Sequence, residues 1–117
     1  MEAIKIYLNN PEGVEGSIRY KTHVQNIGWQ DWVGNGETAG TTGQDLRIEA
    51  VQIELTGAMA EKYDIYYRVH VSDYGTLGWA KNGEVAGTTD YKKAAQSIEI
   101  RLYEKGDSSA PQTGAPT

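Results

Sequence analysis

The sequence of 117 residues contains no cysteine, no phenylalanine and only three prolines. Without cysteine, the chain has no disulfide framework, no thiolate metal site and no thiol nucleophile. It also lacks any apolar run approaching the length of about 18 residues that a membrane-spanning helix needs, so we expect no membrane insertion. A chain of this length buries roughly two-thirds of its unfolded surface, so one hydrophobic core can stabilise it without a metal or a disulfide.

Basic residues are also scarce. There are 11 lysines and arginines against 16 aspartates and glutamates, and the formal net charge is −5. Nucleic-acid binding depends on clustered cations, so we expect no nucleic-acid partner. Only two histidines are present, and the sequence contains no Ser-His-Asp set, no phosphate-binding loop and no metal quartet. These absences predict a protein that is not an enzyme and that uses no cofactor and no metal.

The sequence repeats itself at an interval of 47 residues. Fifteen positions between residues 18 and 55 are identical to those 47 further on, without a gap. In the same frame, residues 2–8 align with residues 49–55 and 96–102. We therefore expect one domain over residues 1–105, made of the end of one repeat (2–10) and two full repeats (17–57 and 64–104). A chain that opens in mid-repeat also predicts neighbouring repeats or domains in a longer parent protein.

Each repeat has the pattern of β-strands. Ile18, Tyr20, Thr22 and Val24 alternate with polar residues, a period of two that predicts a half-buried strand. The closing segments put an apolar residue at every second position in the same way. We expect the closing segment of one repeat and the opening segment of the next to form antiparallel hairpins over residues 2–25 and 49–72. The fold class is all-β, and both an antiparallel pseudo-repeat sandwich and a prism-like barrel fit the pattern.

Short motifs between the strands predict how the chain turns. Asn35-Gly36 and Asn82-Gly83 are typical of tight turns, because both residue types tolerate a positive φ. The small residues of Ala39-Gly40 and Ala86-Gly87 predict a close approach of two backbones or a bend. The final segment, 106–117, has no apolar periodicity and has the composition of a flexible linker.

Several of these motifs together resemble a known repeat family. Gly28-Trp29-Gln-Asp-Trp32, Asn35-Gly-Glu37, Ala39-Gly-Thr-Thr-Gly43 and Arg47-Ile-Glu-Ala50 are similar to the clostridial hydrophobic repeat with a conserved tryptophan, the ChW family. The resemblance implies a tandem module of a secreted or cell-surface protein of a Gram-positive anaerobe, where such repeats attach to polysaccharide or protein partners. It implies no particular set of binding residues.

The tryptophans are the first candidates for a binding surface. Trp32 and Trp79 occupy equivalent positions, which favours a packing role, although a ligand platform stays open. Trp29 is replaced by Thr76 in the second repeat, so we expect Trp29 to be partly exposed. It lies three residues from Trp32, and in an extended segment the two side chains would point to opposite faces.

Polar residues near the tryptophans complete the predicted site. A structural hydrogen-bonding role is expected for His23 and His70. A structural role also stays open for Glu37 and Glu84. A calcium site formed by Asp31, Asn35 and Glu37 near the first turn is the weaker alternative. We predict ligand binding through the Gly-Trp loops and the Asn-Gly turns, with these residues: Trp29, Asp31, Asn35, Glu37, Trp79, Asn82 and Glu84.

The predicted function is that of an extracellular, non-catalytic binding and adhesion module that recognises glycan through an exposed tryptophan. Three alternatives stay open. The partner could be a host or bacterial surface protein, such as an immunoglobulin. The domain could instead be a structural spacer or assembly unit, and a small hydrolase with facing carboxylates is the remote possibility.

Overall fold

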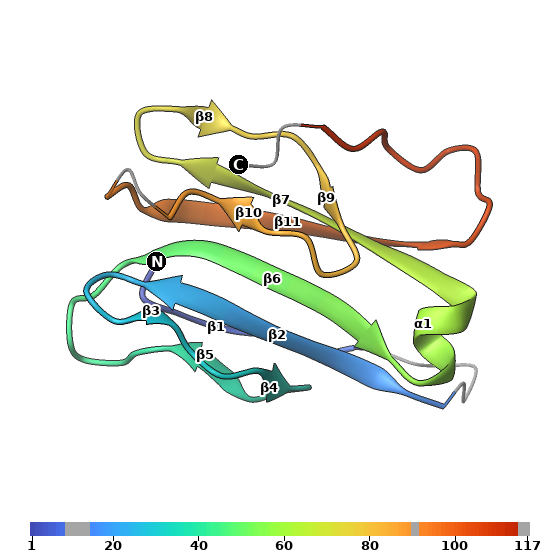
Figure 1. Ribbon diagram of the computed structural model, residues 1–117, viewed down its shortest axis with the longest axis horizontal. Helices are drawn as coiled ribbons and strands as arrows, with labels where there is room; N and C mark the ends of the chain where they lie inside the picture. The colour runs from blue at the N-terminus through green and yellow to red at the C-terminus, as the bar shows by residue number, and fades with distance from the viewer. Residues whose placement is uncertain (9–14, 90–91, 115–117) are drawn as a thin grey trace.

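A computed structural model describes residues 1–8, 15–89 and 92–114, and within them about half of the residues lie in β-strands and almost none in helices (Figure 1). Both repeats contain five strands in the same order, as the duplicated sequence predicts. One strand, β1 (Ala3–Lys5), precedes them. The first repeat contains β2 (Ser17–Val24), β3 (Gly28–Trp29), β4 (Val33–Gly34), β5 (Thr38–Gly40) and β6 (Ile48–Thr56). The second contains β7 (Tyr63–Val71), β8 (Gly75–Thr76), β9 (Ala80–Lys81), β10 (Ala86–Gly87) and β11 (Ala95–Glu104).

The opening and closing strands of the same repeat pair with each other. β2 runs antiparallel to β6, with Tyr20 opposite Ile53, and β7 runs antiparallel to β11, with Tyr67 opposite Ile100. The two short strands of each repeat, β3 and β4 or β8 and β9, pair with the other edge of the opening strand. The apolar residues of each pair share one face, because side chains alternate along a strand.

The hairpins predicted over residues 2–25 and 49–72 are therefore wrong. Neither β1 with β2 nor β6 with β7 forms a hydrogen-bonded ladder. Between β6 and β7 the chain turns through Gly57, at φ 63°, and a short helix, α1 (Ala58–Lys62). This turn carries the chain out of one sheet and into the next, as the right side of Figure 1 shows. The sequence of α1 is too short for a helical period to be visible.

The repeats are joined by sharing strands. The closing strand of one repeat pairs with the Ala-Gly strand of the next repeat, so β1 pairs with β5 and β6 pairs with β10. The hydrogen bonds at the two junctions correspond: Thr41 N donates to Glu2 O, and Thr88 N donates to Glu49 O, both at 3.1 Å. A second equivalent pair joins Gly36 N to Ile6 O at 2.8 Å and Gly83 N to Ile53 O at 2.7 Å.

Glycine is required where the Ala-Gly strand pairs with the closing strand, because the two backbones lie very close together. A Cβ added to Gly40 would lie 2.3 Å from Glu2 O, and one added to Gly87 would lie 2.5 Å from Glu49 O. Both residues also have a positive φ, 97° and 106°. The close backbone approach predicted from the Ala-Gly motif is thus confirmed at both copies.

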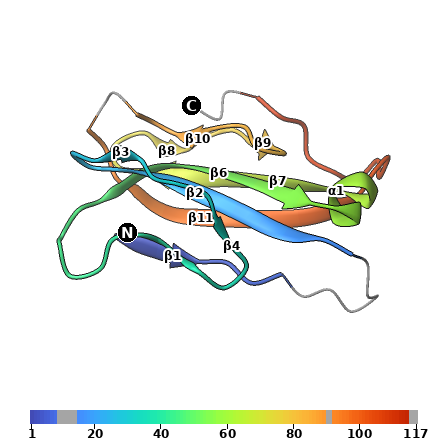
Figure 2. The ribbon, with the colours of Figure 1, turned by 60° about the horizontal axis from the view of Figure 1, so that its bottom comes forward.

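A single core runs through both repeats. Tyr20 and Tyr67 are fully buried, and their hydroxyls donate to the carbonyls of Glu37 and Glu84. In Figure 2, β1 lies on one side of the long strands, and β8, β9 and β10 lie on the other. The described strands form several antiparallel sheets without closing into a barrel. The all-β pseudo-repeat prediction is confirmed, and the arrangement agrees with a sandwich rather than a prism-like barrel.

The segment after β11 lies against the second repeat over its described part. Thr113 forms an isolated parallel bridge with Trp79, and Gly114 N donates to Trp79 O at 3.3 Å. The ends of two predicted segments, 9–10 and 115–117, lie outside the described residues. Across the described ranges, no helix has both the length and the apolar character needed to cross a membrane.

Candidate functional site

Two tryptophans and three basic side chains gather on the outer face of the first repeat. The Lys21 Nζ lies 5.4 Å from the ring centroid of Trp29 and 4.9 Å from that of Trp32. The Arg19 guanidinium lies 4.5 Å from the centroid of Trp32. The imidazole of His23 meets Trp29 edge-on, with ring centroids 5.3 Å apart. We call these five residues the aromatic–cation face; both of its tryptophans are partly exposed.

The strand pattern places these side chains together. Ile18, Tyr20, Thr22 and Val24 are buried, so the residues between them on β2 point outward. β3 pairs with the end of β2 and puts Trp29 opposite His23. The chain from Gln30 to Trp32 is not part of a strand, and Trp32 therefore turns back toward Lys21. The expectation that Trp29 and Trp32 point to opposite faces is wrong, because it assumed one continuous extended segment.

An ion pair lies at one end of this face, and a hydrogen bond between a histidine and a carboxylate lies at the other. Arg19 pairs with Glu54. His23 Nδ1 lies 3.0 Å from Glu49 Oε1, as expected for a structural hydrogen-bonding histidine. Among the described residues, no carboxylate lies within 4.0 Å of the Lys21 ammonium, so its contacts are the two rings. A cation over an aromatic face keeps hydrogen-bonding capacity on its solvent side.

A polar depression adjoins the His23 end of this face. Its volume is about 870 Å³, and His23, Gln25, Gly28, Arg47 and Glu49 contribute to its lining. Arg47 Nε lies 3.2 Å from Glu49 Oε2, and Glu49 is only 4% exposed. Thr89 and Lys92 of the second repeat also line this hollow, which places hydrogen-bonding groups from both repeats beside the partly exposed rings of the first.

The polar residues predicted at the turns make contacts within the protein. The side chains of Glu37 and Glu84 each accept a backbone N–H at 2.7 Å, from Gly34 and Lys81 respectively, and so close their turns. Asn35 Oδ1 accepts Leu8 N at 2.6 Å, and Asn82 Oδ1 accepts Ile65 N at 2.9 Å. The predicted tight turns are confirmed, with Gly36, Asn82 and Gly83 at positive φ.

The structure separates these turns from Trp29. β4, which leads into the first turn, pairs with Arg19 and Tyr20, whereas Trp29 lies opposite His23 at the far end of β2. Asn35 and Glu37 therefore lie toward one end of the face and Trp29 at the other. Asp31 is exposed between the two tryptophans in the chain. In the described part of the chain, no three histidine, aspartate or glutamate side chains are grouped to hold a metal ion.

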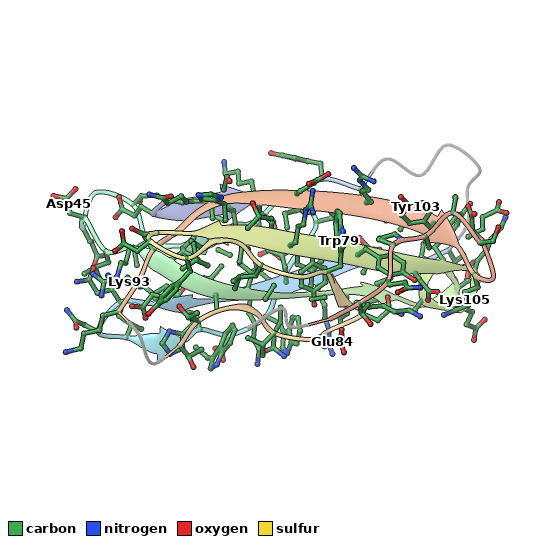
Figure 3. All side chains as sticks on the ribbon, turned by 90° about the horizontal axis from the view of Figure 1, so that it is seen from above. Asp45, Trp79, Glu84, Lys93, Tyr103 and Lys105 are labelled. Atoms are coloured by element: carbon green, nitrogen blue, oxygen red, sulfur yellow. The ribbon has the colours of Figure 1, made fainter. Side chains whose placement is uncertain are left out.

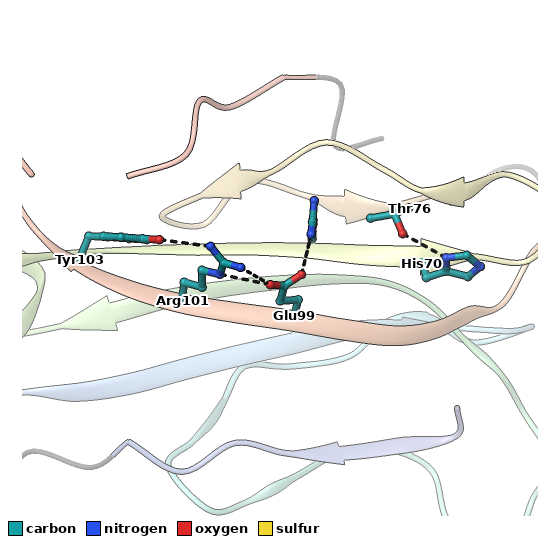
Figure 4. A network of polar contacts seen from close by, with 6 residues as sticks. His70, Thr76, Glu99, Arg101 and Tyr103 are labelled. Atoms are coloured by element: carbon teal, nitrogen blue, oxygen red, sulfur yellow. Dashed lines mark hydrogen bonds and ion pairs between the residues drawn. The ribbon is translucent and has the colours of Figure 1, made fainter. Parts of the chain in front are cut away.

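On the corresponding face of the second repeat the tryptophan is buried, and a smaller depression of about 100 Å³ lies beside Arg68, His70 and Thr76. Trp79 is 9% exposed and lies under two guanidinium groups, 4.5 Å from Arg68 and 5.2 Å from Arg101. Figure 3 shows Trp79 against the strands of the second repeat. Glu99 joins the two arginines, at 2.8 Å from each, in the network of Figure 4. The hydrogen bond from Arg68 is the main cause that lowers the pKa of Glu99.

Two members of the first-repeat face were missed by the sequence analysis. Lys21 and Arg19 were identified only as polar residues of an alternating strand. The period of two already placed them on the outer face, but neither the pairing of β3, which brings Trp29 there, nor the break in the strand that turns Trp32 back was predicted. The available signal was the short distance in sequence between Trp29 and the end of β2, which allows Trp29 to pair beside that strand.

The fold and this face define a class: a tandem-repeat, all-β module whose repeats share strands and whose tryptophans lie beside cations. The family model described as Clostridial hydrophobic W, ChW, matches residues 23–57 and 70–104. The chain belongs to the ChW family and contains two tandem copies of its repeat, which confirms the resemblance noted in the sequence. No curated protein matches the chain significantly, and no solved structure does.

Proposed function

We propose that this chain is a non-catalytic glycan-binding module of an extracellular adhesion protein on a Gram-positive bacterium, and that the aromatic–cation face is its binding surface. The observation that carries the proposal is the convergence of Trp29 and Trp32, both partly exposed, on the ammonium of Lys21. The apolar face of a sugar ring packs on an aromatic ring, and its hydroxyls take hydrogen bonds from neighbouring polar groups. Lys21 and the adjoining polar depression supply such groups.

The size of the face predicts a weak single-site affinity. A tryptophan has a contact area of roughly 150–250 Å². Covering half of one ring face contributes about 2 kcal/mol of gross stabilisation, and two rings about 4 kcal/mol, before the entropic costs of binding. About 4 kcal/mol corresponds to a dissociation constant of roughly 1 mM, so stacking alone gives millimolar binding at best, and tighter binding would need hydrogen bonds from the neighbouring polar groups. Several repeats on one surface would raise the total avidity without any new contact.

The two repeats should contribute unequally. At the position of Trp29 the second repeat has Thr76, whose hydroxyl contacts His70 at 3.1 Å (Figure 4). Trp79 is only 9% exposed, whereas Trp32 is partly exposed although two cations lie over it as well. We assign binding mainly to the first repeat, with Trp29 and Trp32 as platforms and Lys21 as the hydrogen-bond donor between them.

The test is a glycan-array screen followed by titration of the best neutral and acidic ligands. Trp29→Ala should weaken binding at least about tenfold, because it removes half of the stacking surface. Thr76→Ala is the matched control at the equivalent position and should leave binding unchanged. Thr76→Trp should strengthen binding to a polyvalent ligand by adding a second platform. Equal affinity of Trp29→Ala and the unmodified chain would remove this face from the binding site.

The same variants separate the competing functions. A module for a host or bacterial protein would bind that protein, and not free glycan, with loss in Trp29→Ala. A structural spacer would bind neither.

A further inference from the structure

The chain contains three closing strands, β1, β6 and β11. Two of them pair with equivalent strands of the following repeat. β1 holds β5, and β6 holds β10, each an Ala-Gly strand of the next repeat. The third closing strand, β11, pairs with β7 along one edge. Across the described residues no strand pairs with its other edge. The free edge of β11 is thus the position at which the two other closing strands accept an Ala-Gly strand.

The chemistry of β11 matches that of β1. The pattern Ile-x-Ile-x-Leu begins in β1 and continues beyond its end at residues 4–8, and it recurs within β11 at residues 98–102. In β6 the equivalent residues Ile53 and Leu55 are 0% and 7% exposed and belong to the hydrophobic core. In β11, Ile100 is only partly buried and Leu102 is 39% exposed. The apolar residues of β11 are therefore left partly uncovered where those of β6 are buried.

The hydrogen-bonding groups correspond as well. The carbonyls of Ile6 and Ile53 accept the glycine N–H of an Asn-Gly turn, and those of Glu2 and Glu49 accept a threonine N–H. The third members of these two sets are Ile100 and Gln96. We expect their carbonyls to face the free edge, because β11 pairs with β7 in the register in which β6 pairs with β2, with a register shift at the corresponding place.

We propose that the free edge of β11 binds a second copy of this chain, by taking the place of β1 on the β5 strand of that copy. The register follows from the β1–β5 pairing, shifted by two repeat lengths. Ser97, Ile98 and Glu99 of one copy then lie opposite Gly40, Ala39 and Thr38 of the other. The hydroxyl of Tyr20, which accepts Ile6 N at 2.9 Å within one chain, accepts Ile100 N across the interface.

Docking of β11 in place of β1 is favoured by its existing order. β11 is held in its extended form by nine paired positions on β7, whereas among the described strands β1 pairs only with β5. A strand that is already ordered loses less conformational entropy on docking. The contact is head-to-tail, so it extends into linear assemblies or rings and depends on protein concentration.

A reversible lock tests the proposal in the full chain. The sequence has no cysteine, so Lys5→Cys with Thr38→Cys introduces one possible disulfide, between cross-strand partners that hold β1 on β5. Glu2 and Thr41 are a hydrogen-bonded pair, so by alternation Lys5 and Thr38 are a close, non-hydrogen-bonded pair suited to a disulfide. Sedimentation of this variant is compared with and without reductant at concentrations up to about 1 mM, where weak interfaces form.

The reduced variant and the unmodified chain should reach at least twice the monomer mass, and the oxidised variant should stay monomeric. A chain that remains monomeric without the lock, or a locked chain that associates equally, overturns the proposal. A second measurement tests the register: mixing Thr38→Cys with Glu99→Cys under oxidising conditions. The mixed disulfide should form at least ten times faster than with Thr42→Cys, an exposed control on the same segment. Equal rates would exclude this register. Neither experiment depends on glycan binding.

Discussion

Replacing Gly87 by alanine tests whether the repeats are held together by the close pairing of β10 with β6. The new Cβ would lie 2.5 Å from Glu49 O and 2.9 Å from Ala50 Cα, both backbone atoms of a strand fixed by its pairing with β2. A positive φ in a residue with a Cβ costs about 1–2 kcal/mol. The contact adds to this cost, because β6 has no room to move. We expect Gly87→Ala to lower the free energy of unfolding by at least about 3 kcal/mol.

The control is Gly75→Ala in the same repeat. Gly75 also has a positive φ, 82°, but a Cβ there has no neighbouring atom within 4 Å among the described residues. Gly75→Ala should lower the free energy of unfolding only by the cost of the positive φ, about 1–2 kcal/mol. Urea unfolding followed by tryptophan fluorescence measures both variants, provided that the slopes agree. If both variants lower the free energy of unfolding by the same amount, the close pairing of β10 with β6 does not hold the repeats together and the reasoning is wrong.

Two further predictions concern buried polar groups in the second repeat. Burial opposes the ionisation of Asp64, but hydrogen bonds from Lys105 and Asn82 still lower its pKa below the usual value of 3.8. The stabilisation is therefore present above about pH 4 and is lost as the pH falls through the lowered pKa. Asp64→Asn should cost about 1–3 kcal/mol in urea unfolding at pH 7 and much less near pH 2, and a pH-independent difference would contradict this. Tyr67→Phe removes the buried hydroxyl that donates to Glu84 O, and thermal unfolding should show a loss of about 1–2 kcal/mol; an unchanged stability would mean that this bond contributes nothing.

Local pattern predicted the strands but not their partners. The alternation around Tyr20 placed both opening strands, and the Asn-Gly pairs placed both turns. The hairpins over residues 2–25 and 49–72 were wrong because adjacency in sequence was taken for adjacency in the sheet. The closing strand in fact pairs with the opening strand of its own repeat, across a long excursion through the Gly-Trp and Ala-Gly segments.

The candidate site was predicted in part. Trp29 was expected to be partly exposed, and it is. Its convergence with Trp32 on Lys21 was not expected, because the break in the strand between the two tryptophans leaves no mark in the hydrophobic pattern. Glu37 and Glu84 were expected to have a structural or a ligand-binding role, and they close their turns by accepting backbone N–H groups.

The sequence by itself determined the local features of the fold, which depend only on a residue and its near neighbours in the chain. The period-two alternation, the positive-φ turns and the need for a small residue at Gly40 and Gly87 all follow from the steric and hydrophobic properties of short segments. The duplication then required both copies to fold alike. Only the tertiary structure decided which strand each edge accepts, because backbone hydrogen-bonding groups are the same in every strand. The sharing of β6 between repeats, the free edge of β11 and the gathering of two tryptophans around one lysine all result from that choice.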